Sequence, residues 1–473
     1  MATYFARGGA GDDISTAEKR EALAQALKVI NRPLRRVLVL PPDHTRLNSD
    51  AGELTRLLYE MLSPETEVDI MPALGTHSPM AEAQLRRMFG ESIPLARFGV
   101  HDWRNGVRHV GDVPGKLLQE WSGGLVEYDV RVEVNQQLFA GYDLILSVGQ
   151  IVPHEVVGIA NYTKNVVVGA GGSDMINKSH FLGAAYGMER IMGRIENPVR
   201  RLFNYAAGSF LGELPIVFVL TVMEKRKATG GMVMRGLYVG DDMETFTLGA
   251  QLSQKVNFDL LDSPLRKVLV YLDPHEFKST WLGNKAVYRT RMAMADGGEL
   301  IVLAPGLKEF GEDTEIDRLI RKYGYRGTPA TLAAVKANAE LRNNLSAAAH
   351  LIHGSSEGRF RITYCAGPQM SQEALRSVGF EAGNLDATLK RYDPGNLKDG
   401  PNRLPDDEEV FYISNPALGL WALKSQFETV SQPVITWSQR GKPRTVNKGA
   451  SRRLRERRPQ KALASMDQSR GEV

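Results

Sequence analysis

Residues 36–46 read RVLVLPPDHTR, and this stretch decides the fold. Its apolar first half predicts a short buried strand, which the two prolines bring to an end. Over residues 49–62, leucines and a methionine recur at the spacing of one helix face, so we expect an amphipathic helix that begins at Ser49 or Asp50. A strand, a polar loop and a helix in this order form the repeating unit of α/β proteins with parallel sheets.

The same alternation of strands and helices continues along the chain. Further strands are expected at 68–71, 143–148 and 216–221 and, after residue 266, at 268–272, 300–304, 360–364 and 410–413. Helical segments lie between them, near 81–88, 280–295, 331–349 and 371–378. Because crossover connections between parallel strands are right-handed, the loops that follow the strands gather at one edge of each sheet.

These two sets of elements predict an α/β protein of two domains with mainly parallel sheets and an active-site cleft between them. The expected parts are an N-terminal domain, a C-terminal domain, a helix that packs back on the first domain and a basic, disordered tail, at 1–260, 264–413, 414–430 and 431–473. The tail owes its charge to residues 440–461, which hold ten Lys or Arg and one acid. This basic segment is the one part of the chain for which contact with nucleic acid is considered, and a solvated extension is the simpler interpretation of its charge.

Composition excludes several classes of protein. The chain has 473 residues, of which 42% are hydrophobic and 24% charged, so it can build cores and is not disordered throughout. Its single cysteine, Cys365, excludes an internal disulfide and a multi-cysteine zinc site. The longest uncharged apolar run, 214–223, is about half the length of a membrane helix, and the N-terminus lacks the apolar core of a signal peptide. We therefore expect a cytoplasmic protein with no membrane partner.

Three loops that follow predicted strands carry polar groups of complementary chemistry. Asp43 and Arg46 come directly after the first strand, and the guanidinium of Arg46 has the fork that binds a carboxylate, with Asp43 behind it. His77 and His154 each follow a later strand and are candidate general bases. Each feature alone has a simpler explanation. Asp43 and Arg46 could be an ion pair that stabilises a turn, and each histidine could simply be exposed to solvent. Together, at one sheet edge, they would form one site.

The segment 161–172 is rich in glycine and contains one lysine. Gly169, Gly171 and Gly172 would let backbone amides approach a phosphate group. Residues 172–179 miss the phosphate-binding pattern GxxxxGK[ST] by one position, the second glycine, and this argues against a nucleotide hydrolase. Lys164 lies among apolar and small residues. A buried lysine loses its proton more readily and becomes nucleophilic, although most lysines reach solvent.

The order and spacing of these residues resemble the lactate racemase family, whose members use a nickel-pincer nucleotide. The resemblance runs from about residue 30 to about residue 425 and rests on Asp43-x-Thr45-Arg46, Gly75-Thr76-His77, His154, Lys164 and His180. It implies that Lys164 is joined to the cofactor through a thioamide and that His180 is the nickel ligand. It also makes His77 and His154 the acid/base pair. The remaining implied contacts are cofactor contacts at Thr45, Gly75, Thr76, Gly169, Gly171 and Gly172, and substrate contacts at Arg46, Asp43, Leu282 and Lys285.

The implied activity is an isomerase reaction, the inversion of C2 in a 2-hydroxy acid. If a base takes the hydroxyl proton while hydride leaves C2, no carbanion forms beside the carboxylate, and a planar 2-keto acid results. Return of hydride to the other face inverts the centre, and two histidines serve the two orientations of the hydroxyl group. Nickel(II) with sulfur and carbon donors favours square-planar geometry, which leaves one position for an imidazole. The expected partners are the small-molecule substrate and the enzymes that make the cofactor.

The chain departs from the family pattern at four places, and two of these are Leu47, in place of a proline after Arg46, and Ser78, in place of an arginine after His77. Asn161, Tyr162 and Thr163 stand where the family commonly has Gly-Gly-Arg before the lysine, which leaves the fit of the cofactor open. Leu282 stands where members that process lactate carry glutamine, so a hydroxy acid with a larger or apolar side chain is expected.

Two other interpretations of the function stay open. One is a zinc hydrolase with His77, His154 and His180 as ligands, although the chain lacks the short HxH and HExxH motifs. The other is a nucleotide- or metal-binding protein without the pincer cofactor, such as a hydrolase with a phosphate-binding loop.

Overall fold

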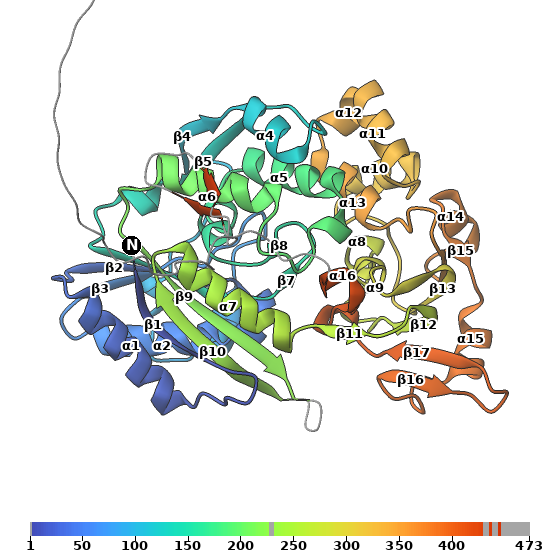
Figure 1. Cartoon of the computed structure of the whole chain (residues 1–473), viewed down its shortest axis with the longest axis horizontal. Helices are drawn as coiled ribbons and strands as arrows, with labels where there is room; N and C mark the ends of the chain where they lie inside the picture. The colour runs from blue at the N-terminus through green and yellow to red at the C-terminus, as the bar shows by residue number, and fades with distance from the viewer. Residues whose placement is uncertain (1, 227–230, 429–434, 438–442, 446–473) are drawn as a thin grey trace, which may run out of the picture. The chain divides into compact units, whose positions relative to one another are not determined.

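The structure is a computed structural model that describes residues 2–226, 231–428, 435–437 and 443–445. Residues Met1–Thr429 form one compact unit. Two six-stranded sheets, each flanked by helices, dominate this unit (Figure 1). The predicted fold class, α/β with mainly parallel sheets, is confirmed.

The first sheet lies in the N-terminal half of the chain. Its strand order is β1 (Thr3–Gly8), β10 (Met232–Gly240), β9 (Ile216–Lys225), β6 (Leu144–Gln150), β2 (Arg36–Leu40) and β3 (Glu67–Ile70). Neighbouring strands from β9 to β3 are parallel, whereas β10 is antiparallel to both of its neighbours. The expected strands at 68–71, 143–148 and 216–221 correspond to β3, β6 and β9.

Strand β2 shows why this sheet is buried on both faces. Val37 and Val39 belong to one hydrophobic cluster, and Leu38 and Leu40 belong to another, because successive side chains of a strand point to opposite faces. One face is covered by α1 (Thr16–Ile30) and α2 (Ala51–Leu62), the other by α5 (Ser173–Tyr186), α6 (Pro198–Phe210) and α7 (Met243–Val256). Helix α2 begins where the sequence predicts, directly after Asp50.

The second sheet repeats this arrangement in the C-terminal half. Its order is β15 (Glu381–Ala382), β14 (Arg361–Ala366), β13 (Met294–Ala304), β12 (Leu265–Tyr271), β17 (Glu409–Ile413) and β16 (Gly400–Arg403). Only the edge strand β16 pairs antiparallel among these described strands. The four strands expected in this half correspond to β12, β13, β14 and β17.

Two expected helices are divided into shorter ones. The segment 280–295 is divided into α8 (Thr280–Gly283) and α9 (Lys285–Thr290), because Asn284 caps α8 and residues from Met294 enter β13. The segment 331–349 contains α11 (Thr328–Ala337), α12 (Ala339–Arg342) and α13 (Leu345–His353), which break at asparagines. Asn344 caps α13 by accepting a hydrogen bond from the amide of Ala347.

The helix expected at 414–430 is also replaced by shorter elements. The segment contains a 3₁₀ turn at Pro416–Leu418, the strand β18 (Trp421–Leu423) and a single helical turn, α16 (Ser425–Glu428). Strand β18 pairs in parallel with β11 (Asp259–Leu261). Its backbone groups therefore form hydrogen bonds between strands and not the bonds of a helix. Of the predicted tail, only β19 (Ile435–Trp437) and β20 (Pro443–Thr445) are described, as an antiparallel pair, and the rest of residues 431–473 lies outside the described residues.

The remaining elements connect these layers. They are η1 (His44–Ser49), α3 (Glu82–Phe89), η2 (Leu95–Arg97), β4 (Val107–Val113), α4 (Gly115–Ser122), β5 (Val130–Asn135), η3 (Gln136–Phe139), β7 (Pro153–His154), β8 (Gly158–Ile159), η4 (Asn165–Gly169), η5 (Met188–Arg190), α10 (Thr314–Tyr323), α14 (Gln372–Ser377) and α15 (Leu385–Tyr392).

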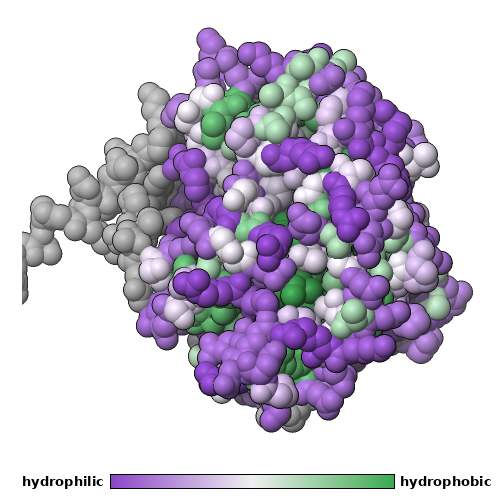
Figure 2. Space-filling model, turned by 90° about the vertical axis from the view of Figure 1, so that its right-hand side faces the viewer, coloured by the Kyte–Doolittle hydropathy of each residue, from purple (hydrophilic) through white to green (hydrophobic). Residues whose placement is uncertain are grey.

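One hydrophobic core extends through both halves of the unit. The same cluster of buried residues contains Leu38 and Leu40 of β2 and Val268 and Val270 of β12. Helix α13 of the second half packs along α5 of the first. Polar residues prevail on the face shown in Figure 2, with hydrophobic residues scattered between them. Within the described ranges, no helix is both long enough and apolar enough to cross a membrane.

Candidate active site

The loop after β2 brings Asp43 and His77 together. Asp43 is buried at the start of η1, and its Oδ1 accepts hydrogen bonds from the amide and the hydroxyl of Thr45. Its Oδ2 lies 2.5 Å from Nδ1 of His77, in the loop after β3. Burial alone would raise the pKa of Asp43, but the hydrogen bonds from His77 and Thr45 outweigh it and lower this pKa. The ionised carboxylate accepts from Nδ1–H of His77, which leaves Nε2 of that ring free for a proton.

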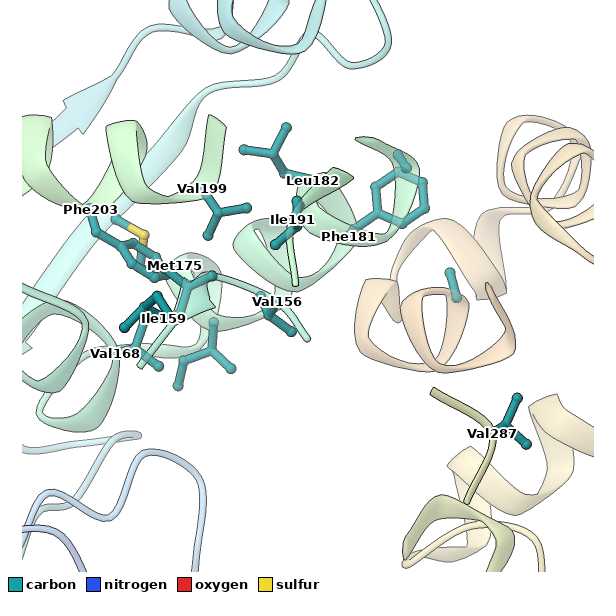
Figure 3. Packing of buried hydrophobic residues seen from close by; sticks show 14 of the residues in the cluster. Val156, Ile159, Val168, Met175, Phe181, Leu182, Ile191, Val199, Phe203 and Val287 are labelled. Atoms are coloured by element: carbon teal, nitrogen blue, oxygen red, sulfur yellow. The ribbon is translucent and has the colours of Figure 1, made fainter. Parts of the chain in front are cut away.

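His154 lies in the short strand β7 that follows β6. Its Nδ1 accepts a hydrogen bond of 3.1 Å from the amide of Val156. Burial holds the pKa of His154 well below its usual value, so the ring is neutral and its proton resides on Nε2. The side chain of Ile159 lies near Met175 and Phe203 of the neighbouring helices, and Val156 belongs to the same buried cluster (Figure 3). This packing fixes the turn that carries His154.

Lys164 precedes η4 and is reached through a strained stretch of backbone. Asn161 and Tyr162 have φ angles of 65° and 59°, in the left-handed region that glycine adopts most easily. These are the two positions where the family pattern has glycines. Within the described ranges, the Lys164 ammonium makes no hydrogen bond or ion pair. Burial first, and then the positive charge of Arg46, lower the pKa of Lys164 to about 8.

Arg200 of α6 holds this stretch in place. Its guanidinium is fully buried and donates to the carbonyl oxygens of Ile159 and Asn161 and to the Thr163 hydroxyl, at 2.5, 3.2 and 3.1 Å. It also lies 4.4 Å from the ring centroid of Phe246. Tyr162 stacks on that ring with a centroid distance of 5.1 Å. No local sequence signal marks Arg200, because its partners are 37 to 41 residues away in the chain.

His180 projects from α5 with one ring nitrogen free. Its Nδ1 lies 2.5 Å from the carbonyl oxygen of Ile176, one turn earlier, so Nδ1 carries the proton and Nε2 keeps its lone pair. Burial first, and then the charge of Lys164, lower the pKa of His180 to about 4. A neutral imidazole with a bare Nε2 is the form that binds a metal.

Arg46 and Lys285 supply positive charge near these groups. The charge of Arg46 lowers the pKa values of His154, Lys164 and Lys285, which places it near all three. Lys285, at the start of α9, lies 5.4 Å from the ring centroid of Phe277, and burial lowers its pKa. The structure therefore brings together the predicted residues Arg46, His154, Lys164, His180 and Lys285.

Residues 12–190 match the family model of the lactate racemase N-terminal domain. The N-terminal part of the chain is therefore similar to the N-terminal domain of lactate racemases. No curated protein matches the chain.

Solved structures extend the likeness in fold to both halves of the molecule. A crystal structure of a protein from Thermotoga maritima has a TM-score of 0.71 at 23% identity, over 88% of this chain and 99% of that one. The lactate racemase apoprotein from Thermoanaerobacterium thermosaccharolyticum has a TM-score of 0.64 at 15% identity, over 88% of this chain and 94% of that one. At these identities the likeness shows a shared fold.

The structure gives the glycines of the matched N-terminal segment a packing role. A Cβ at Gly171 would lie 1.9 Å from the carbonyl oxygen of Val167, and a Cβ at Gly172 would lie 2.7 Å from a carboxylate oxygen of Glu133. At Gly169 it would lie 2.9 Å from Cβ of Ala73. Gly75 has a φ of +57° and its amide donates to Gly169. Contacts of Gly75, Thr45, Thr76 and the three later glycines with a cofactor stay a prediction.

The phosphate-binding loop is contradicted by the structure. Residues 173–179 belong to α5 and do not form a loop, and from Ile176 onward their backbone amides bond within the helix. Lys178 donates to the Asp129 carbonyl at 2.7 Å and to the Asp174 carboxylate at 2.8 Å. Its charge is already neutralised by protein groups.

A three-histidine zinc site is contradicted as well. Among the described residues, no group of three His, Cys, Asp or Glu side chains is placed to hold a metal ion. His77 is bonded to Asp43, and its side chain is 56% exposed. A metal at His180 would need its other ligands from outside the protein.

Four further polar residues surround the site and were not predicted from the sequence. Glu155 carries a carboxylate 3.8 Å from Nδ1 of His154 and 4.0 Å from Arg289. The charge of Arg289 and a hydrogen bond from a backbone amide keep the pKa of Glu155 low against the opposing effect of its burial. Tyr288 and Arg289 follow Lys285 on α9, and His353 ends α13. Glu155 could have been found from the sequence, because it directly follows the candidate base His154. The residues of α9 and α13 could not, because only contacts between distant parts of the chain bring these helices to the site.

Proposed function

We propose that this protein is a racemase or epimerase that inverts C2 of a 2-hydroxy acid, with a nickel-pincer nucleotide tethered to Lys164. The observation that carries the proposal is a pair of groups without protein partners among the described residues, the Lys164 ammonium and Nε2 of His180, next to the candidate acid/base residue His154. The match of residues 12–190 to the lactate racemase N-terminal domain supports a racemase in general.

The residues present fit the proposed cofactor. Lys164 has the lowered pKa that attachment through its amine requires, and His180 offers a single metal ligand with a fixed tautomer. Because the described residues hold no cluster of three ligands, the other donors to nickel would come from the nucleotide. When bound, the cofactor supplies the reversible hydride acceptor that the reaction needs.

The cationic side chains would bind the substrate carboxylate. Arg46 is exposed at the loop after β2 and can form two parallel hydrogen bonds with a carboxylate, and Lys285 contributes a second charge. Asp43 bonds to Thr45 and His77 and thereby fixes the start of the Arg46 loop. The backbone amide of Leu282 is held by Ser279, and its side chain packs against the shared core.

The two histidines differ in the state in which the structure holds them. His77 presents a bare Nε2, so it can take the hydroxyl proton while the hydrogen on C2 leaves with its bonding electrons, and a 2-keto acid results. His154 presents Nε2–H and can donate a hydrogen bond to the substrate oxygen. To take a proton from the opposite enantiomer, the His154 ring must first release the Val156 amide.

Expression together with cofactor-synthesising enzymes tests the proposal. We expect nickel in a 1:1 ratio to protein and a mass increase on the peptide that contains Lys164. Lys164→Ala should abolish the adduct, and His180→Ala should lose nickel while the adduct persists. Lys178→Ala, in which a lysine of α5 paired with Asp174 is removed, is the control and should retain both.

Activity completes this test. Loaded protein should interconvert the enantiomers of a 2-hydroxy acid, as read by optical rotation, and His77→Ala and His154→Ala should depress interconversion without loss of nickel. Loaded cells that yield protein with neither metal nor adduct would overturn the proposal.

A further inference from the structure

Each of the two candidate acid/base histidines has a carboxylate beside its Nδ1. At His77 it is the carboxylate of Asp43, which lies 2.5 Å from Nδ1 and accepts its proton in a hydrogen bond. At His154 it is the carboxylate of Glu155, whose Oε2 lies 3.8 Å from Nδ1. That distance is longer than a hydrogen bond, and Nδ1 of His154 instead accepts from the Val156 amide at 3.1 Å. The two sites share their chemical groups but differ in their hydrogen bonds.

The hydrogen bond from Val156 suits a resting ring and not one that transfers protons. While Nδ1 accepts from this amide, the neutral ring of His154 carries its single proton on Nε2. Loss of that proton to a substrate oxygen would leave an imidazolate anion, and Nε2 cannot take a further proton while it carries one. To give or take a proton at Nε2, the ring must therefore hold a proton on Nδ1 throughout. Because Nδ1–H and the Val156 amide are both donors, the ring then needs an acceptor.

Glu155 is the acceptor within reach of that proton. In the described part of the chain, the largest effects of charge on His154 come from Glu155, Lys164, His180 and Arg46. Glu155 is the one acid among these four. Its carboxylate is ionised and therefore only accepts hydrogen bonds, from a neutral ring and from an imidazolium alike. An approach of about 1 Å would convert the present distance into a charge-assisted hydrogen bond.

Arg289 holds the Glu155 carboxylate close to the strand that carries His154. Its guanidinium comes from α9 and donates to the carbonyl oxygen of Pro153 at 3.4 Å. The same guanidinium lies 4.0 Å from Oε2 of Glu155, which is also longer than a hydrogen bond. One side chain thus contacts the residues on both sides of His154. The oxygen of Glu155 that faces Nδ1 is kept in place and stays available as an acceptor.

We propose that Glu155 is a positioning residue that accepts Nδ1–H of His154 and so holds this ring in the tautomer that transfers protons at Nε2. This inference rests on the proposed function and adds a switch between two hydrogen bonds of His154. In the resting state the Val156 amide donates to Nδ1. In the active state Nδ1–H donates to Glu155, and the hydroxyl proton of the substrate moves to Nε2, while no proton passes to Glu155. His77 needs no switch, because Asp43 already holds its Nδ1–H.

Nuclear magnetic resonance of the full-length, cofactor-free protein tests the hydrogen bond directly. With ¹⁵N in the histidine rings, the signals of His154 are those that disappear in His154→Gln. As the pH is lowered, Nδ1–H should appear as a downfield, slowly exchanging proton in the wild-type protein. In Glu155→Gln this signal should move upfield, and the pKa of His154 should fall by at least about one pH unit, because the imidazolium loses its negative partner.

A second measurement separates the two histidines in the cofactor-loaded protein. Each enantiomer of the 2-hydroxy acid that the protein inverts fastest is mixed with excess protein, and the 2-keto acid formed is measured after an acid quench. Glu155→Gln should slow its formation at least tenfold from one enantiomer and less than twofold from the other. His77→Ala should show the opposite preference, because it removes the base for the other orientation of the hydroxyl group.

Two further variants separate position from charge and from folding. Glu155→Asp keeps the charge and withdraws the carboxylate by one carbon, so it should slow the same enantiomer while it lowers the pKa of His154 less than Glu155→Gln does. Glu196→Gln is the matched control. Glu196 is a carboxylate of similar exposure in the same half of the chain, 17% against 21%, and its partner at 3.9 Å is Arg201. This variant should leave both measurements unchanged.

The two measurements decide the two proposals separately. Equal slowing of both enantiomers by Glu155→Gln would show a general structural role and overturn the inference. An unchanged Nδ1–H signal and pKa of His154 in that variant would overturn it as well. The magnetic resonance result needs no cofactor. Loaded protein that inverts no hydroxy acid would therefore refute the proposed function, while the pairing of Glu155 with His154 would stand or fall on the spectra.

Discussion

Lys164 combines features that seldom occur in one lysine. Its ammonium is largely desolvated, has no partner in the part of the chain that the structure describes, and lies near the positive charge of Arg46. Each of these disfavours the charged form, and a pKa of about 8 leaves roughly a tenth of the amine neutral at pH 7. An unperturbed lysine is neutral in fewer than about one molecule in a thousand at that pH. Lys164 is thus a nucleophile before any cofactor arrives.

This reactivity predicts a specific pH dependence in the apoprotein. Reductive methylation of Lys164, followed by peptide mass spectrometry, should rise with pH around an inflection at about pH 8. Arg46→Ala removes a positive charge and should move the inflection to higher pH, whereas Glu155→Gln removes a negative charge and should move it lower. Lys19 is the internal control, because Asp50 and Glu53 raise its pKa. Equal inflections for Lys19 and Lys164 would contradict the burial of the Lys164 amine.

At the scale of elements, α6 fixes the strained segment before Lys164. Arg200 satisfies two backbone carbonyls and one hydroxyl there, so Arg200→Ala would leave buried acceptors unpaired. Each such group costs about 1–3 kcal/mol, and we expect urea unfolding at pH 7 to show a loss of at least about 3 kcal/mol.

The next residue of the same helix gives a matched control for this prediction. Arg201 is 32% exposed, and its one ion pair, with Glu196, is long at 3.9 Å. Arg201→Ala should therefore lower the free energy of unfolding by less than about 1 kcal/mol. Similar losses in the two variants would show that Arg200 does not hold the segment 159–163.

The sequence predicts strands and strand-end loops well because their signals are local. The apolar run of β2 and the polar residues directly after it identify Asp43 and Arg46 without knowledge of the fold. Arg200, Tyr288 and His353 carry no such signal, because α6, α9 and α13 bring them to the site through contacts distant in sequence. The expected helix at 414–430 fails for the same reason, since pairing of β18 with β11 overrides a local helical pattern.

At the scale of the whole molecule, the described halves share their interior. A single hydrophobic cluster joins β2 to β12, and Arg291 connects the halves through polar contacts. Arg291 is 2% exposed and donates to Glu189 at 2.7 Å and to the carbonyl oxygens of Ile352 and Ser355 at 3.2 and 3.1 Å. A shared core of this kind couples the unfolding of its parts. The division into domains at 1–260 and 264–413 is a prediction that this coupling can test.

We expect one cooperative unfolding transition for residues 2–428. In urea, followed by hydrogen exchange and mass spectrometry, peptides from β6 and β12 should lose protection at the same midpoint. Arg291→Ala breaks a half-buried ion pair and leaves two carbonyl oxygens without their donor, so it should lower both midpoints together, by about 3 kcal/mol in the free energy of unfolding. Arg361→Ala removes an exposed partner of Glu299 and should leave them nearly unchanged. Separate midpoints for the two strands would instead establish two independently folding domains, and the shared core would then contribute little to their coupling.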